Sequence, residues 1–466
     1  MKKLLLLACL PIVACAPKMK VEWYSTTPES QWEAKKYAKT ELEAAYNVNI
    51  DLDDALQAVE GFGACFNELG WTSLSYLSEA DREAVMSEMF EPGVGAGFTL
   101  TRMPVGANDF SREWYSYCET DGDFNMETFS IANDRETLIP FIKNARKYNS
   151  ALRVLASPWS PPTWMKYSKH YACKPSQRWN DLPGSPALDR EGENMFIQEP
   201  AYFAAYAEYF AKFIDAYKAE GIDIFGVAPQ NEFNSCQIFP SCTWQASGLN
   251  EFVGKYLGPR MKDKGVEMLF GTMERADHRL VDTVMQDPLS SRYITWIGFQ
   301  WAGKGAIEAV HNTYPEMKLI QTESECGDGR NSWDYCFYTW SLMKHYFDNG
   351  ACAYQYWNIS LEADALSHWG WKQNSLVSVD KDARTYKYNP EYYLMKHFSR
   401  YVRPGARMIA AAGDYKDILA FVNEDGAVTL LMANQTDEMC KVNVNVGEMS
   451  VAPELAPMSI NTIVLK

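Results

Sequence analysis

The segments Val227-Ala-Pro-Gln-Asn-Glu232 and Leu319-Ile-Gln-Thr-Glu323 carry most of what this chain of 466 residues reveals about its fold. In each of them, a short apolar run typical of a buried strand ends in a glutamate. About three strand–helix units of roughly 30 residues separate the two glutamates. Residues three strands apart in an eight-stranded ring can face each other across its mouth, so two carboxylates are expected to meet there.

The alternation of apolar runs with amphipathic stretches extends over most of the chain. Strands are predicted at residues 57–63, 97–104, 152–157, 224–228, 266–271, 294–300, 318–322 and 351–357. Several of these runs are almost continuously apolar, as strands buried on both faces should be. Amphipathic helices are predicted at residues 78–86, 199–219, 333–347 and 391–401. The pattern predicts an α/β fold, a (β/α)8 TIM barrel over residues 57–402.

The residues on either side of the barrel predict a smaller β-sandwich at its side. Within residues 403–466, the segment 417–432 is typical of a β-hairpin that turns at residues 423–426. The segments Val442-Asn-Val-Asn-Val446 and Ile460-Asn-Thr-Ile-Val-Leu465 add further strands. Residues 21–56 precede the first barrel strand, and we expect their strands to join the same sandwich.

Residues 1–20 predict a lipoprotein signal peptide and tether. Met1-Lys-Lys supplies the positive charge, residues 4–13 are mostly apolar, and Ile12-Val-Ala-Cys15 is similar to a bacterial lipobox. Cleavage before Cys15 would leave a lipid anchor on that cysteine. The expected location is therefore that of an exported lipoprotein of the outer membrane, on its periplasmic or cell-surface face. An ordinary secretory signal with a chance cysteine is the alternative.

The composition excludes several classes of partner. The net charge is −16 and the mature chain has no basic run, which argues against nucleic acid and against anionic membrane surfaces as partners. The six histidines are scattered and no C-x-x-C spacing occurs, so neither a metal nor another cofactor is expected. Cys236 and Cys242 are the nearest plausible disulfide pair. The sequence gives no indication of the oligomeric state.

The position of Glu232 at the carboxyl end of a strand marks it as a functional acid, because barrel enzymes place their active sites there. The preceding Asn231 can hydrogen-bond a sugar hydroxyl beside the reacting carbon. Glu323 follows its strand in the same way, whereas the competing Glu325 begins a loop. Arg102, at the end of the second strand, is the expected cation that keeps one carboxylate ionised. The alternatives are a helix-capping carboxylate for Glu232 and a purely structural ion pair for Arg102.

Other strand ends carry groups suited to binding sugars. Glu68 follows the first strand and could accept hydrogen bonds from sugar hydroxyls. Tryptophans follow the third, sixth and eighth strands, namely Trp159, Trp164, Trp301 and Trp357. Their rings can stack on the apolar faces of a pyranose, although such rings can equally fill a core. A nucleophilic serine is not indicated, because no G-x-S-x-G motif occurs. Two facing carboxylates among such rings are typical of a glycosidase.

At these residues the chain resembles glycoside hydrolase family 30, over about residues 55–466. This family includes glucosylceramidases and β-1,6-glucanases. The motifs that carry the resemblance are Gly61-Phe-Gly, Thr101-Arg-Met-Pro, Ala156-Ser-Pro-Trp-Ser-Pro-Pro-Thr-Trp164, Gln230-Asn-Glu232, Gln321-Thr-Glu-Ser-Glu-Cys326, Tyr356-Trp-Asn358, Trp371-Lys-Gln-Asn374 and His397-Phe-Ser399.

The resemblance implies a retaining double displacement, with Glu232 as the acid/base and Glu323 as the nucleophile. It places the family's sugar contacts on Glu68, Trp159, Asn231, Trp357 and Asn374. The arginine that supports the nucleophile falls on Arg102.

The sequences of two motifs, Gln321-Thr-Glu-Ser-Glu-Cys326 and Trp369-Gly-Trp-Lys-Gln-Asn374, are more similar to the bacterial β-1,6-glucanase branch than to the glucosylceramidases. Glucosylceramidases carry a His-Trp-Tyr-like run after the sixth strand, where this chain has Gln300-Trp301-Ala302. We therefore expect endo-cleavage of β-1,6-glucan. The alternative is a glucosylceramidase, which would need an apolar groove such as the 235–244 loop could provide. A third interpretation is a non-catalytic glycan-binding lipoprotein, which the presence of both glutamates disfavours.

Overall fold

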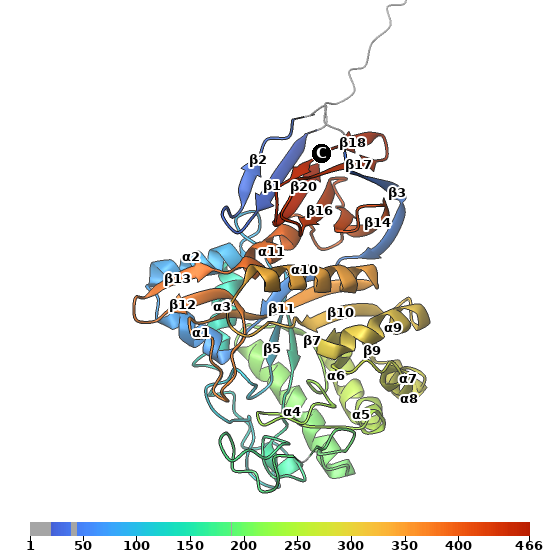
Figure 1. Cartoon of the computed structure of the whole chain (residues 1–466). Coiled ribbons are helices and arrows are strands. Elements are labelled where there is room, and N and C mark those ends of the chain that lie inside the picture. Colours follow the sequence, from blue (N-terminus) through green and yellow to red (C-terminus); the bar gives the residue numbers. More distant parts are fainter. Residues whose placement is uncertain (1–19, 39–43, 188) are drawn as a thin grey trace, which may run out of the picture.

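The computed structural model describes residues 20–38, 44–187 and 189–466. The predicted lipobox and its Cys15 lie outside these residues and stay predictions. Within the described ranges, no helix is both long enough and apolar enough to span a bilayer. The chain folds around two separate sheets, one above the other in Figure 1.

The lower sheet in Figure 1 is a closed ring of eight parallel strands. Its strands are β4 (Gly61–Cys65), β5 (Leu100–Pro104), β6 (Arg153–Ser157), β7 (Ile224–Val227), β8 (Glu267–Met273), β9 (Ile294–Gln300), β10 (Lys318–Glu323) and β11 (Ala351–Glu362). The ring closes because β11 pairs in parallel with both β10 and β4. Beyond β11, the strands β12 (Ser375–Asp380) and β13 (Thr385–Tyr388) extend the sheet. The predicted (β/α)8 barrel with a side β-sandwich is confirmed.

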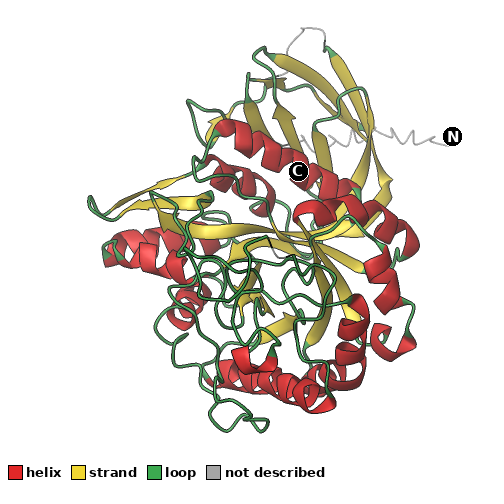
Figure 2. Ribbon diagram, turned by 60° about the horizontal axis from the view of Figure 1, so that its bottom comes forward, coloured by secondary structure: helices red, strands yellow, loops and turns green. Residues whose placement is uncertain are grey.

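Helices cover the outside of the barrel, and loops gather over its centre (Figure 2). The helices are α1 (Glu68–Ser75), α2 (Glu79–Phe90), α3 (Leu138–Tyr148), α4 (Pro200–Ala219), α5 (Ala246–Phe252), α6 (Gly258–Lys264), α7 (Arg279–Met285), α8 (Pro288–Ser291), α9 (Ile307–Thr313), α10 (Trp333–Asp348) and α11 (Pro390–Ser399). As expected of an N-cap, the Ser78 hydroxyl accepts a hydrogen bond from the Asp81 N–H at the start of α2.

The interior of the barrel is filled by apolar side chains below the site. Residues from the barrel strands form a separate buried cluster there, made of Leu100, Leu155, Ala228, Leu269, Trp296, Ile320, Cys352 and Ala353. Because successive side chains of a strand alternate between faces, Leu100 and Arg102 of β5 share one face. Arg102 therefore lies on the same face of β5 as Leu100, closer to the carboxyl end of the strand than this apolar cluster.

The upper sheet combines strands from both ends of the chain. Its strands are β1 (Val21–Thr26), β2 (Glu33–Lys35), β3 (Tyr46–Ala58), β14 (Arg407–Gly413), β15 (Ile418–Val422), β16 (Val428–Asn434), β17 (Cys440–Val446), β18 (Met449–Val451), β19 (Glu454–Leu455) and β20 (Ser459–Leu465). β1 pairs with β20, and β3 lies between β14 and β17. The N-terminal strands are thus integral to this sheet.

The predicted strand at 57–63 is wrong, because it joins two strands of different sheets. Residues 57 and 58 end β3, which pairs with β14 in the sandwich. The chain then crosses to the barrel, where β4 begins at Gly61. Gly61 has a φ of 148°, and a Cβ added there would lie 2.4 Å from Thr99 Oγ1. The crossing falls at Val59 and Glu60, so the charged Glu60 and the following Gly61 are the local signs of it.

His397 of α11 joins the barrel to the sandwich. Its two ring nitrogens each lie 2.8 Å from a buried hydroxyl, Thr462 Oγ1 on β20 and Thr26 Oγ1 on β1. Burial lowers the pKa of His397 to about 3, so the ring is neutral at neutral pH. One side chain thereby holds the barrel's last helix to both termini of the chain.

We predict that His397→Ala lowers the free energy of unfolding by about 2 kcal/mol at pH 8, because two buried hydroxyls lose a partner. The loss should be smaller at pH 5. A histidine whose folded pKa is depressed stabilises the fold above its unfolded pKa of about 6.5, and this stabilisation is lost as the pH falls toward 3. Urea unfolding at both pH values measures it. His278→Ala, at a side chain that is 47% exposed, is the control, and an equal loss in both variants would contradict the assignment.

Candidate active site

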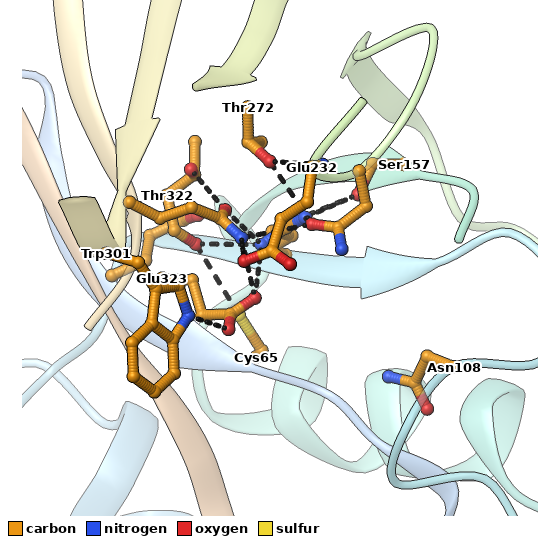
Figure 3. A network of polar contacts seen from close by, with 12 residues as sticks. Cys65, Asn108, Ser157, Glu232, Thr272, Trp301, Thr322 and Glu323 are labelled. Atoms are coloured by element: carbon orange, nitrogen blue, oxygen red, sulfur yellow. Dashed lines mark hydrogen bonds and ion pairs between the residues drawn. The ribbon is translucent and has the colours of Figure 1, made fainter. Parts of the chain in front are cut away.

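The carboxyl groups of Glu232 and Glu323 point toward each other at the mouth of the barrel (Figure 3). Glu232 follows β7 and Glu323 ends β10, the fourth and seventh strands of the ring. A single nitrogen, Gln300 Nε2, lies 2.9 Å from Glu232 Oε1 and 3.3 Å from Glu323 Oε2. The distance between these two carboxyl oxygens therefore cannot exceed the sum of the two distances from Gln300 Nε2. The convergence of the two glutamates expected from their spacing is present.

Arg102 is the centre of the polar network beneath the two acids. Its side chain is fully buried, and its Nη1 lies 3.1 Å from Glu323 Oε2. Nη1 also donates to the Thr322 carbonyl and to Gln300 Oε1, both at 3.2 Å. Nε and Nη2 donate to Ser157 Oγ, and Nη2 donates to Asn231 Oδ1 at 2.6 Å. The predicted arginine thus contacts Glu323 and not Glu232, which distinguishes the two carboxylates chemically.

Asn231 and Gln300 complete this network. Asn231 Oδ1 accepts hydrogen bonds from Arg102, Gln300 and Thr272 Oγ1. Its oxygen is therefore fully used, and its amide nitrogen remains to bind a ligand. Gln300 was not predicted as a site residue. In the sequence, the Gln300-Trp301-Ala302 run indicates only a departure from the family pattern, and the bridging position of Gln300 appears only in three dimensions.

The backbone at Glu232 and Trp301 is held in an unusual conformation. Their φ angles are 43° and 47°, in the left-handed region that residues other than glycine seldom adopt. Surrounding hydrogen bonds hold both. The Glu232 N–H donates to Thr272 Oγ1 at 3.1 Å, and Trp301 Nε1 donates to Glu323 Oε1 at 3.0 Å. The strain aims one carboxyl and one indole into the same space, as is common at functional sites.

Burial and charge separate the protonation states of the two acids. Burial raises the pKa of Glu232, against the opposing effect of hydrogen bonds from Gln300 and Ser235. Burial also raises the pKa of Glu323, while the Arg102 guanidinium lowers it and the negative charge of Glu232 raises it. The direct ion pair with Arg102 favours the negative charge on Glu323. Burial nevertheless raises the pKa of Glu323 to about 7. Because Glu323 is ion-paired with Arg102 and Glu232 is not, a proton shared by the two carboxyl groups is favoured on Glu232.

A cavity of about 410 Å³ opens above these acids. Five residues predicted from the sequence line it, namely Trp159, Asn231, Glu232, Trp301 and Glu323. Trp159 is 2% exposed and stacks on Trp357, with ring centroids 5.5 Å apart. The Arg102 guanidinium lies 4.6 Å from the Trp159 ring centroid. Trp357 is fully buried behind Trp159, and its indole nitrogen has no hydrogen-bond partner.

The cavity contains two further acids that the sequence did not indicate. Asp109 is 5% exposed, its Oδ1 has no partner, and burial followed by the charges of Glu323 and Glu232 raises its pKa. Glu274 is 2% exposed and follows β8 directly. The rule that singled out Glu232, an acid just after a buried strand, applies equally to Glu274. Asp109 lies in a longer loop that carries no such signal.

Glu68 does not belong to the cavity, which corrects its predicted role as a sugar contact. Its carboxylate is fully buried and its oxygens accept hydrogen bonds from the side chains of Arg112, Asn133 and Thr137 and from the Arg112 N–H. These four donors lie far from Glu68 in the sequence. Glu68 therefore anchors the loop before α3 to the start of α1.

Asn374 is also turned away from the cavity. Its oxygen accepts the N–H groups of Gly329 and Asn331, both at 3.0 Å, and its nitrogen donates to Glu391 at 2.7 Å. The neighbouring Gln373 lines the cavity instead. Asn374 thus fixes the loop after β10 and is not placed to bind sugar.

Three other predicted candidates have structural contacts only. Glu325 is paired with Lys304 at 2.6 Å, so it does not compete with Glu323. Trp164 is 2% exposed and donates to the Cys118 carbonyl, outside the cavity lining. The suggested disulfide between Cys236 and Cys242 is wrong, since both are free thiols. Among the described residues, no group of three or more His, Cys, Asp and Glu side chains is arranged to hold a metal ion.

Two family models match the chain over most of its length. The Glycosyl hydrolase family 30 TIM-barrel domain matches residues 59–402, and the Glycosyl hydrolase family 30 beta sandwich domain matches residues 405–463. The chain belongs to glycoside hydrolase family 30. The resemblance inferred from the motifs is thereby confirmed.

Relatives that are named for different enzyme activities match this chain. A lysosomal acid glucosylceramidase of Mus musculus is 25% identical over 448 residues, which cover 89% of this chain and 82% of that protein. An endo-1,6-beta-D-glucanase of Neurospora crassa is 23% identical over 404 residues, which cover 81% and 79%. The solved structure of the endo-beta1,6-glucanase BT3312 matches with a TM-score of 0.80 and 26% identity, covering 95% of this chain and 98% of that one. Family membership alone does not choose between these substrates.

We predict that Gln300→Ala lowers kcat about 100-fold, because a small misplacement of reacting groups costs that much. The variant removes the amide that contacts both acids while leaving Arg102 in place. Steady-state rates on a β-glucoside measure the effect. Gln435→Ala, at an exposed position of the sandwich, is the matched control. A rate within threefold of wild type would show that Gln300 does not position the acids.

We predict the opposite pattern for Glu68→Ala. Removing one partner of a buried ion pair should cost about 3–5 kcal/mol of stability, because Arg112 and the other donors lose their acceptor. The folded fraction should keep kcat/KM within about threefold, since Glu68 does not line the cavity. Thermal unfolding and active-site-normalised rates separate the two effects. A large loss of kcat/KM without loss of stability would restore Glu68 to a binding role.

Proposed function

We propose that this chain is a retaining glycoside hydrolase that cleaves β-1,6-linked glucan within the polymer. The observation that carries the proposal is the bridge from Gln300 Nε2 to both carboxyl groups. Because both oxygens contact the same nitrogen, the distance between Glu232 Oε1 and Glu323 Oε2 cannot exceed the sum of the two hydrogen-bond distances. Retaining enzymes hold their two carboxyls ~5–5.5 Å apart, whereas inverting enzymes keep ~6.5–9.5 Å to admit a water. The observed span favours the retaining arrangement.

The two acids have distinct roles in this mechanism. An ionised Glu323 oxygen attacks the anomeric carbon, and the bond from that carbon to the leaving oxygen breaks. Glu232 gives its proton to the leaving oxygen. A water then attacks the anomeric carbon of the glycosyl ester, passing its proton to Glu232 and releasing Glu323. The contacts support these roles, because Arg102 forms an ion pair with Glu323, whereas Glu232 receives hydrogen bonds from the uncharged side chains of Gln300 and Ser235.

The rim of the cavity supports a polysaccharide substrate. Beyond the aromatic residues, the lining is polar and includes Ser235, Gln237, Arg275 and Gln373. Such groups suit a leaving group that carries hydroxyls. The similarity of the fold to the endo-beta1,6-glucanase BT3312 is consistent with this choice.

The glucosylceramidase alternative has weaker support. It would require an accessible apolar groove, for which the 235–244 loop was the candidate. That loop is packed inward, since Cys242 and Trp244 are fully buried and Trp244 stacks on Phe196 with ring centroids 4.5 Å apart. Phe239 is the residue of this loop that brings an apolar ring to the cavity. No extended apolar surface is therefore offered to a lipid tail by these residues.

We predict that Glu323→Gln and Glu232→Gln each lower kcat on β-1,6-glucan by at least about 1,000-fold, with melting temperatures close to wild type. The first product released by the wild type should be the β-anomer, as proton NMR of a fresh reaction would show. An α-anomer would contradict the retaining mechanism. Near-wild-type turnover by either variant would contradict the roles.

The pH dependence of kcat/KM should be bell-shaped, because activity requires an ionised Glu323 and a protonated Glu232. Burial raises the pKa of Glu232, so activity is lost only as the pH rises through that elevated value. Glu232→Gln should abolish this basic limb when measured on an aryl glucoside whose leaving group needs no proton. A basic limb that persists in this variant would assign it to another group.

A further inference from the structure

The wall of the cavity beyond Glu232 is built from three separate segments. Glu274 follows β8, the strand beside the one that carries Glu232. Phe239 comes from the loop after Glu232, and Trp371 comes from the segment between β11 and β12. All three line the cavity. None of them contacts Arg102 or Glu323, so this wall lies on the acid/base side, where a leaving group departs.

Glu274 contributes a buried carboxyl group that the protein uses only in part. Its Oε1 accepts the Asn234 N–H at 2.9 Å and lies 3.8 Å from Arg275 Nη1. Its own backbone N–H is a further donor to this carboxyl, and within the described residues Oε2 has no hydrogen bond or ion pair with another side chain. Burial, followed by the charge of Glu232, raises the pKa of Glu274 to about 8. A carboxyl group accepts hydrogen bonds when it is ionised and can also donate one when it is protonated, so Glu274 can bind a hydroxyl in either form.

Arg275 supports this wall and is not free for an anion. Its Nε and Nη2 lie 2.7 and 3.0 Å from the two carboxylate oxygens of Glu191. Its Nη1 donates to the Glu274 carbonyl at 3.2 Å. This bidentate pairing occupies the fork with which arginine binds carboxylates and phosphates. An uncharged ligand therefore fits the wall better than an acidic one.

Trp371 and Phe239 form an aromatic corner beside Glu274. Their ring centroids are 4.5 Å apart at an interplanar angle of 87°. The Trp371 indole nitrogen is buried and has no hydrogen-bond partner. A buried donor without a partner is costly, and a ligand that accepts its hydrogen bond would relieve that cost. The corner thus combines an apolar ring face with an unused donor.

We propose that Glu274, Phe239 and Trp371 form a subsite for the sugar unit that leaves, in which Trp371 Nε1 and Glu274 Oε2 hydrogen-bond its hydroxyls. The inference rests on the proposed function and makes it more specific, because it assigns the leaving group as an uncharged sugar. A pyranose offers an apolar face to the aromatic corner and hydroxyls to both unused polar groups. A long alkyl chain would leave both groups unpaired, which such sites reject strongly.

The test compares two substrates that share the cleaved glucose and differ in the leaving group. One is a β-1,6-linked glucose trisaccharide and the other is 4-nitrophenyl β-glucoside, whose leaving group has no sugar hydroxyls. Trp371→Phe keeps a ring and removes the N–H, and Glu274→Ala removes the carboxyl. Each variant should lower the ratio of kcat/KM for the trisaccharide to that for the aryl glucoside about tenfold, the effect of one hydrogen bond. The ratio cancels any loss of folded enzyme.

Glu274→Gln is the matched control, because its amide can still accept the Asn234 N–H and hydrogen-bond a hydroxyl. It should keep the ratio within about threefold of wild type. A ratio that is unchanged in both Trp371→Phe and Glu274→Ala would overturn the subsite while leaving the proposed function intact. A wild-type enzyme that cleaves the aryl glucoside but no β-1,6-linked glucose oligomer would instead overturn the proposed function.

Discussion

The structure of the site depends on one buried cation. Arg102 has no exposed surface, and its guanidinium donates to groups at the ends of β6, β7, β9 and β10, namely Ser157, Asn231, Gln300 and Thr322–Glu323. A charge removed from water in this way needs a paired anion and further acceptors, or it strongly destabilises the fold. The barrel supplies both at the carboxyl ends of its strands, above an apolar floor. The same contacts that make the cation tolerable also fix the position and charge of Glu323.

Much of the architecture is readable from the sequence because the barrel repeats one pattern. The predicted strand at 294–300 coincides with β9, and the predicted helices at 199–219 and 333–347 differ from α4 and α10 by one residue at a single end. The error at 57–63 arises where two strand segments of different sheets are separated only by Val59 and Glu60. Hydrophobicity reports burial, and it does not report which core a strand enters.

From the sequence, site residues could be predicted only where the position of a residue along a barrel strand determines its function. Glu232, Glu323 and Arg102 stand at strand ends, and barrel geometry brings such positions together. Glu68 follows β4 and Asn374 directly precedes β12, and the hydrogen-bonding capacity of both is consumed by partners distant in the sequence. Gln300 shows the converse, since nothing in its local sequence indicates that one amide contacts both acids. Which polar group remains free for a ligand is a property of the whole fold.

The pairing of β1 with β20 bears on how the chain is completed during synthesis. Val21 pairs with Leu465, so β1 can find this neighbour only after β20 has been synthesised. β3 likewise pairs with two strands that are synthesised much later, β14 and β17. Until then these edges are open to pairing with other chains, the usual hazard of an unprotected strand. β20 therefore joins the earliest described strand to the late strand β16 in one sheet, and β1 and β16 both lack a neighbour until it is in place.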